Sequence, residues 1–145
     1  MPGLVLANLV LTGYLTGLIW TIQVVHYPLF QEVGAAQFPR FHALHGNRIS
    51  AVVALPMVVE LGLSVLLVVF RPAAFPALAA WACLALTLLI WLSTFLVSVP
   101  IHGRLGEAGH DTRHIARLVR TNWTRTIAWT LRLAILTYGL SGMLR

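Results

Sequence analysis

The chain alternates between long apolar runs and two polar stretches. The apolar runs cover residues 4–27, 49–70, 76–99 and 122–144. Each run reaches the roughly 20 residues that a helix needs to cross about 30 Å of hydrocarbon. The pattern predicts four membrane-spanning helices in one transmembrane domain, residues 1–145. Pro28 and Pro100 are expected to end the first and third spans, because proline disrupts the preceding turn of a helix.

Polar residues recur inside each apolar run. Their steps of three, four and seven residues place each set on one helix face. The sets are Thr12, Thr16, Gln23 and His26; His42, His45 and Glu60; Thr87, Trp91, Thr94, Ser98 and His102; and Asn122, Arg125, Trp129 and Arg132. Polar side chains are costly in lipid, so these faces should point at one another. The predicted fold is an all-α, integral membrane up-down-up-down four-helix bundle with a polar, histidine-rich end.

Composition and charge support a membrane location. The chain is 59% hydrophobic and 10% charged, against about 25% charged residues in soluble domains. All ten basic residues are arginine, giving a net charge of +6. Six of them lie in the 28–48 and 101–121 connections, against Arg71 and Arg145 on the other side. This bias predicts a multi-pass protein of the cell membrane with its long connections in the cytoplasm, and argues against nucleic acid as a partner. A homo-oligomer is left open.

Histidines gather at one end of the predicted bundle. His26 ends the first span, His42 and His45 precede the second, and His102 follows the third. Imidazoles three residues apart on a helix can share a metal ion when further ligands come from elsewhere. These four histidines are therefore candidate ligands of a transition metal or haem. The alternative is interfacial histidines bonded to backbone carbonyls or lipid head groups.

Glu60 is the one acidic residue deep in a span. It lies about 18 Å along its helix from Arg48, and Arg132 lies about 15 Å along the fourth helix from Asn122, at 1.5 Å per residue. The two charges should therefore meet at one depth. A Glu60–Arg132 pair is predicted, either as a structural contact between helices or as a catalytic carboxylate whose pKa burial would set.

Two further polar-stripe features suggest a ligand. Trp91 and Trp129 at middle depth could wall a pocket for a flat hydrophobic molecule, or pack the core. Arg125 could extend to lipid head groups, or hold an anionic group or substrate oxygen by charge-assisted hydrogen bonds.

Two short motifs resemble a known family. Ser98-Val99-Pro100-Ile101-His102-Gly103-Arg104-Leu105 and Asn122-Trp123-Thr124-Arg125-Thr126 are similar to motifs of the anthrone-oxygenase-like family of small four-helix membrane proteins. The resemblance covers roughly residues 93 to 132. It implies oxidation of a lipophilic aromatic, such as an anthrone, by dioxygen. It carries Asn122, Arg125 and His102 forward as site candidates.

Three functions follow from these observations. The favoured one is a membrane oxidoreductase or oxygenase acting on a lipophilic aromatic or quinone-like molecule, with a histidine-bound metal or haem near one membrane face. Asn122, Arg125, Trp91 and Trp129 would bind that molecule, and His26, His102 and Glu60 would be catalytic. The second is a non-catalytic haem or metal protein, and the third is an accessory subunit of a membrane complex or transporter.

Overall fold

Every apolar run forms a helix in the computed structural model, which describes residues 2–144. Apolar segments favour helices because a helix satisfies its backbone hydrogen bonds internally. The helical segments are α1 (Pro2–Thr21), η1 (Ile22–His26), η2 (Pro28–Glu32), α2 (Phe38–Val69), α3 (Ala77–Ser93), η3 (Thr94–Ser98), α4 (Val99–Ala108) and α5 (Thr112–Met143). The prediction of an all-helical protein is confirmed for the described residues, which contain no strand.

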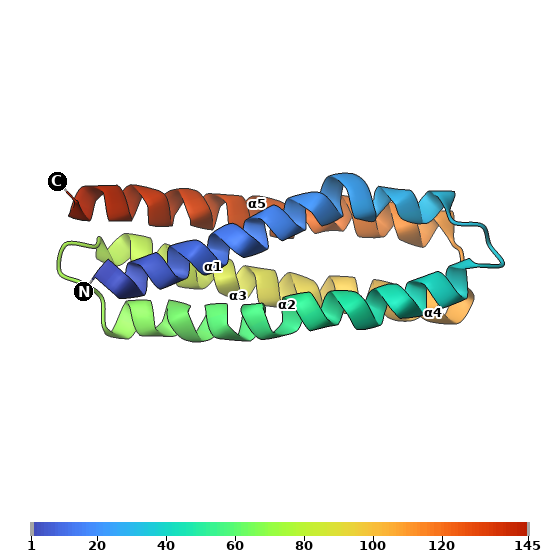
Figure 1. Cartoon of the computed structure of the whole chain (residues 1–145), viewed down its shortest axis with the longest axis horizontal. Helices are drawn as coiled ribbons and strands as arrows, with labels where there is room; N and C mark the ends of the chain where they lie inside the picture. Colours follow the sequence, from blue (N-terminus) through green and yellow to red (C-terminus); the bar gives the residue numbers. More distant parts are fainter. Residues whose placement is uncertain (1, 145) are drawn as a thin grey trace.

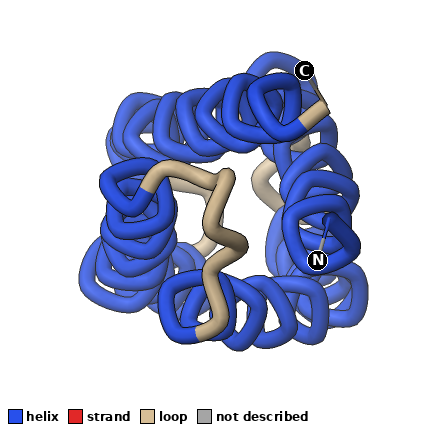
Figure 2. Tube along the Cα trace, turned by 90° about the vertical axis from the view of Figure 1, so that its left-hand side faces the viewer, coloured by secondary structure: helices blue, strands red, loops and turns tan. Residues whose placement is uncertain are grey.

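The helices form four long columns. α1 continues through η1 into η2, and α3 continues through η3 into α4. Figure 1 shows the columns lying side by side along one axis, with the two ends of the chain at the same end. The view along that axis shows the columns surrounding a common centre (Figure 2). α5 and α2 each pack against both α1 and α3, so α2 and α5 occupy opposite corners.

Helix boundaries differ from the sequence-based prediction at the histidine-rich end. α2 begins at Phe38 instead of residue 49, and α5 begins at Thr112 instead of 122. The predicted connections 28–48 and 101–121 are therefore largely helical. Hydropathy marks where a helix enters hydrocarbon, whereas capping marks where it begins. Asp111 caps α5 by accepting hydrogen bonds from the backbone N–H groups of Arg113 and His114, which is a usual N-terminal signal.

Pro100 does not end its helix, so that expectation is wrong for the third span, whereas the helical run of the first span does end at His26, two residues before Pro28. Pro28 opens the 3₁₀ turn η2 and Pro100 lies in the first turn of α4. Proline is tolerated in a first turn, where its missing N–H would have no partner. In both places the preceding turn, η1 or η3, is π-helical. A π-turn widens the helix, and such turns are frequent at functional sites.

Three helical stretches are long and apolar enough to cross a membrane: Gly3–Glu32, Phe38–Val69 and Ala77–Ala108. Only 22% of the most apolar window of Phe38–Val69 is buried, so most of its apolar side chains face outward. α5 is not among the three. Polar residues on its buried face lower its mean hydropathy, including Asn122, Arg125 and Arg132. Arg145, used above to argue orientation, lies outside the described residues.

Candidate functional site

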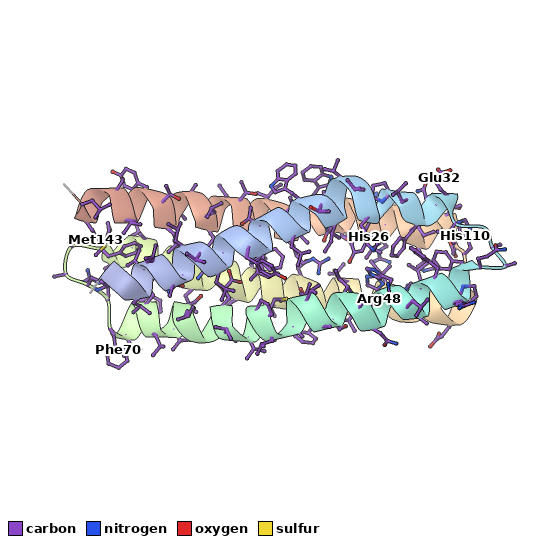
Figure 3. All side chains as sticks on the ribbon, viewed as in Figure 1. His26, Glu32, Arg48, Phe70, His110 and Met143 are labelled. Atoms are coloured by element: carbon purple, nitrogen blue, oxygen red, sulfur yellow. The ribbon has the colours of Figure 1, made fainter. Side chains whose placement is uncertain are left out.

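The four predicted histidines meet between three helical columns. His26 ends η1, His42 and His45 lie in the first turns of α2, and His102 lies in α4. His26 Nε2 is 2.7 Å from His45 Nδ1, and His42 Nε2 is 3.1 Å from His102 Nδ1. The His45 and His102 rings stack with their centroids 5.6 Å apart. Figure 3 shows His26 on the side of the molecule where His110 and Glu32 lie, away from Phe70 and Met143.

Phenylalanines enclose this histidine cluster, defined as His26, His42, His45 and His102. Phe30 and Phe38 are fully buried, and Phe30 packs edge-on against His45 with 5.0 Å between ring centroids. Phe38 stacks on His42. The other two histidines lie outside the cluster: His110 Nε2 contacts the Gln31 carbonyl, and His114 bonds to Asp111. His114 is in the first turn of α5 and not in a loop.

The imidazoles are hydrogen-bonded to one another, which restricts their protonation. In each pair one nitrogen donates and the other accepts, so both rings of a pair cannot be fully protonated. His45 Nε2 is sealed from solvent and has no partner. If His45 Nδ1–H donates to His26 Nε2, then His45 Nε2 carries no proton. In that tautomer the buried Nε2 has only an unsatisfied lone pair. We assign that tautomer, because a buried N–H without an acceptor costs more.

The present arrangement of the cluster does not fit a metal ion or haem. Two nitrogens that share a tetrahedral zinc at 2.0–2.1 Å lie about 3.3 Å apart, whereas the His26–His45 nitrogens are at 2.7 Å. No group of three or more histidine, cysteine, aspartate or glutamate side chains within residues 2–144 is placed to hold a metal ion. A porphyrin would have to separate rings that are now in contact. Ligation by His26, His42, His45 and His102 stays a prediction.

A chain of hydrogen bonds joins the cluster to α5. The Tyr27 hydroxyl is hydrogen-bonded to His102 Nε2 at 3.1 Å and accepts from Arg125 Nη2 at 3.4 Å. Arg125 also donates to Asn122 Oδ1 and, at 3.4 Å, to Thr94 Oγ1. The predicted site residues Asn122, Arg125 and His102 are thus brought together, with Tyr27 as the link between the last two.

Two members of this network were missed by the sequence analysis. Tyr27 was treated only as the end of a span, although it directly follows His26. Gln23 was placed on the polar stripe but not in the site. Its Oε1 accepts from Asn122 at 2.8 Å and its Nε2 donates to the Val119 carbonyl at 3.1 Å. Both residues flank or lie in η1, whose π-turn no sequence period reveals.

A cavity of about 380 Å³ adjoins the network. Its volume is in the range of small-molecule pockets, about 300–1,000 Å³. The wall is mainly apolar and includes Leu15, Ile22, Val53, Met57, Phe95 and Val99. Trp91, Trp129, Arg125 and His102 also line it, whereas Asn122, His26 and Glu60 do not. Four of the predicted site residues therefore share one cavity.

The cavity opens on the outer surface between α2 and the α3–η3–α4 column. Ala54 and Val58 of α2, together with Phe95 of η3 and Val99 of α4, line the cavity and are exposed. α2 packs against α3 and α4 but makes little contact with the π-turn η3 between them. An apolar molecule could therefore reach the cavity from the side.

Three residues that line the cavity each have a buried polar atom with no hydrogen-bond partner: Arg125 Nε, Trp91 Nε1 and Ser98 Oγ. An unpaired buried polar atom costs about 1–3 kcal/mol, and such atoms are uncommon in folded proteins. All three can donate a hydrogen bond. They belong to residues that line the cavity, although the atoms themselves are covered by neighbouring protein atoms.

Glu60 and Arg132 form the predicted ion pair, with 3.0 Å between Oε1 and Nη1. Trp129 Nε1 donates to the other carboxylate oxygen at 2.9 Å, and Thr12 donates to Oε1 at 3.1 Å. Arg132 Nη2 also donates to Asn8 Oδ1 at 2.7 Å. Both carboxylate oxygens are thus occupied. Trp129 therefore presents its ring to the cavity while its N–H is used elsewhere.

Comparison of the chain with protein families, with curated proteins and with solved structures found no match in any of the three. The similarity to the anthrone-oxygenase-like family accordingly remains a hypothesis drawn from the two short motifs.

Proposed function

We propose that the chain is an integral membrane protein in which all four columns cross the bilayer, in an up-down-up-down arrangement with the two long connections in the cytoplasm. The outward-facing apolar side chains of the three candidate spans support lipid contact. α5 qualifies by length, since its 32 residues extend about 48 Å at 1.5 Å per residue. Its charged residues inside the bilayer face the bundle, where Glu60 neutralises Arg132.

Within this bundle, we propose an oxidoreductase or oxygenase that acts on a lipophilic aromatic or quinone-like substrate. The observation that carries the proposal is the apolar cavity lined by Trp91, Arg125 and His102. The substrate enters from the bilayer between α2 and η3 and lies against Trp91. Arg125 and Trp91 hold its oxygen atoms, and Asn122 positions Arg125.

The proposed reaction converts an activated methylene, as in an anthrone, to a ketone with dioxygen. The carbon loses two hydrogens and gains one oxygen atom, and the second oxygen atom leaves as water. Tyr27 and His102 are placed to accept a proton from the substrate, because Tyr27 lines the cavity and its hydroxyl bonds to His102. Imidazole suits this role because it exchanges protons near neutral pH.

Oxygen uptake by purified protein in detergent tests the proposal directly. Anthrone is added as substrate, and formation of the quinone is followed by absorbance. We expect turnover by the wild-type protein and a fall of about 10²-fold or more in His102→Phe, typical of loss of an acid–base group. His110→Phe is the matched control, because His110 lies outside the cluster and does not line the cavity. Uptake no faster than from empty micelles would refute the proposed reaction.

A second candidate is a non-catalytic haem or metal protein, for which the imidazoles of the histidine cluster would have to separate around the bound group. Its supporting observation is that four imidazoles from three columns lie in mutual contact. Optical and elemental analysis of the purified protein separates the two. A Soret band or stoichiometric metal that is lost in His45→Phe would favour this candidate, since His45 does not line the cavity. An accessory subunit and a homo-oligomer stay predictions.

A further inference from the structure

α5 carries two buried arginines on one face, and they differ in their counterions. Arg132 is fully buried and paired with Glu60. Arg125 is 6% exposed, and its partners Thr94, Tyr27 and Asn122 are all neutral. A buried cation is stable when an opposite charge or a full set of acceptors surrounds it. Arg125 lacks the opposite charge, whereas the Nε of both arginines lacks an acceptor.

The chain holds no spare acid for Arg125. It contains four aspartates and glutamates in total. Glu60 belongs to Arg132, and Asp111 caps α5 and bonds to His114. Glu32 and Glu107 are exposed at the histidine-rich end. The counterion of Arg125 must therefore come from outside the side chains of this protein.

The other polar groups on the cavity wall are already paired. Tyr27 bonds to His102, and His102 uses both nitrogens, with Tyr27 and His42. Thr94 Oγ1 donates to the Ile90 carbonyl, and Ser50 Oγ donates to the Gly46 carbonyl. What remains for a ligand is the guanidinium charge of Arg125, whose partners in the protein are all neutral. The cavity thus offers hydrogen-bond donors and one positive charge.

We propose that the cavity binds its ligand as an oxyanion: a planar lipophilic aromatic with a deprotonated hydroxyl conjugated to a carbonyl. This inference rests on the ligand cavity of the proposed function and specifies its substrate class. The anionic oxygen is the counterion of the Arg125 guanidinium, which lines the cavity. Charge-assisted hydrogen bonds of this kind are short and strong, and more so away from water. The aromatic body lies against Trp91 and Phe95.

A matched pair of ligands tests this directly. 2-Hydroxy-1,4-naphthoquinone is an anion at neutral pH, and its methyl ether, 2-methoxy-1,4-naphthoquinone, is a neutral molecule of similar shape. Titration calorimetry at pH 7.5, with protein in detergent micelles and empty micelles as the blank, gives both affinities. We expect the anion to bind at least about tenfold more tightly than the ether, a difference of about 1.4 kcal/mol.

Variants assign the preference to Arg125. Arg125→Gln should abolish the anion preference, and Arg125→Lys should keep part of it. Arg117→Gln, which removes the same charge at an exposed position of the same helix, should keep all of it. If Arg125→Gln does not fold, the affinities of the two ligands for the wild-type protein and for Arg125→Lys test the proposal instead.

The outcomes separate this inference from the proposed function. If the wild-type protein binds the two ligands equally, the proposal of an oxyanion ligand is wrong, whereas the proposal of a lipophilic ligand cavity is supported. An unchanged preference in Arg125→Gln shows that Arg125 is not the counterion and also overturns it. Binding of neither ligand overturns both proposals.

Discussion

Glu60 and Arg132 are 72 residues apart in the chain and form an ion pair of 3.0 Å in the interior, where neither side chain is more than 1% exposed. Six residues on three columns share it: Asn8 and Thr12 of α1, Glu60 and Ser64 of α2, and Trp129 and Arg132 of α5. The pair therefore fixes the relative depth of these three columns. This favours a structural role for Glu60, and its catalytic role stays a prediction.

Breaking this pair should destabilise the bundle. Glu60→Ala leaves the Arg132 guanidinium buried without a counterion, and we expect a loss of about 3–5 kcal/mol. Glu60→Leu with Arg132→Leu removes both charges and should cost less than Glu60→Ala alone. Equilibrium unfolding in mixed micelles measures these values. Glu107→Gln, at an exposed site, is the control and should change stability by less than about 0.5 kcal/mol. A Glu60→Ala loss no larger than this control would contradict a structural role.

Ser98→Ala should stabilise the ligand-free protein while weakening ligand binding. The Ser98 hydroxyl is sealed and unpartnered, so its removal should raise the free energy of unfolding by up to about 1 kcal/mol. Loss of a hydrogen bond to the ligand should reduce affinity by about three- to tenfold. Unfolding and calorimetry report the two effects separately.

Ser50→Ala is the control for that experiment. Ser50 lines the same cavity, but its hydroxyl already donates to the Gly46 carbonyl at 2.7 Å. We expect no gain in stability from this change. If Ser98→Ala behaves like Ser50→Ala in both measurements, the unpartnered hydroxyl does not mark a ligand contact.

Ala54→Phe should slow ligand binding by narrowing the lateral opening. Ala54 is exposed and lines the cavity between α2 and η3. A phenyl ring at this position obstructs the path from the bilayer, so the association rate should fall about tenfold while the fold persists. Stopped-flow mixing with ligand-loaded vesicles measures that rate. Ala51→Phe adds the same ring on the same helix at an exposed position that does not line the cavity. Equal association rates in the two variants would place the access route elsewhere.

Asp111 should make the start of α5 sensitive to acid. The hydrogen bond from the His114 side chain, followed by that from the His114 backbone N–H, holds the pKa of Asp111 below its ordinary value of 3.8. A lowered pKa in the folded state means that the contribution to stability is present above pH 3.8. It is lost as the pH falls through the lowered value.

Asp111→Ala is therefore expected to lower stability at pH 7, and by progressively less as the pH falls below 3.8. Asp111→Asn keeps an N-capping side chain and should lose less at pH 7. Unfolding followed by circular dichroism between pH 2 and pH 7 measures both variants. A loss in Asp111→Ala that does not change with pH would show that the charge of the carboxylate does not contribute.

The sequence by itself determined the helical class, three helices that are long and apolar enough to cross a membrane, and the faces that carry polar residues. These follow from local physics: apolar length predicts a span, and a period near 3.6 places Glu60, Arg125 and Arg132 on inward faces. The positions of Glu60 and Arg132, counted along straight helices, were enough to predict that the two residues form a pair. The convergence of His26, His42, His45 and His102 followed from alternating the direction of the columns.

Only the tertiary structure decided how the site is built. The π-turns η1 and η3 have no hydropathy signature, yet they shift the residues that follow them, including Tyr27 and His102, relative to α1 and α3. The cavity exists because η3 makes little contact with α2. Unpartnered donors likewise cannot be predicted from sequence. A residue type defines which hydrogen bonds a side chain can make, but packing decides which partners lie within hydrogen-bonding distance. Arg125 and Arg132 are the same residue on one helix face, and only packing gives one of them an acid.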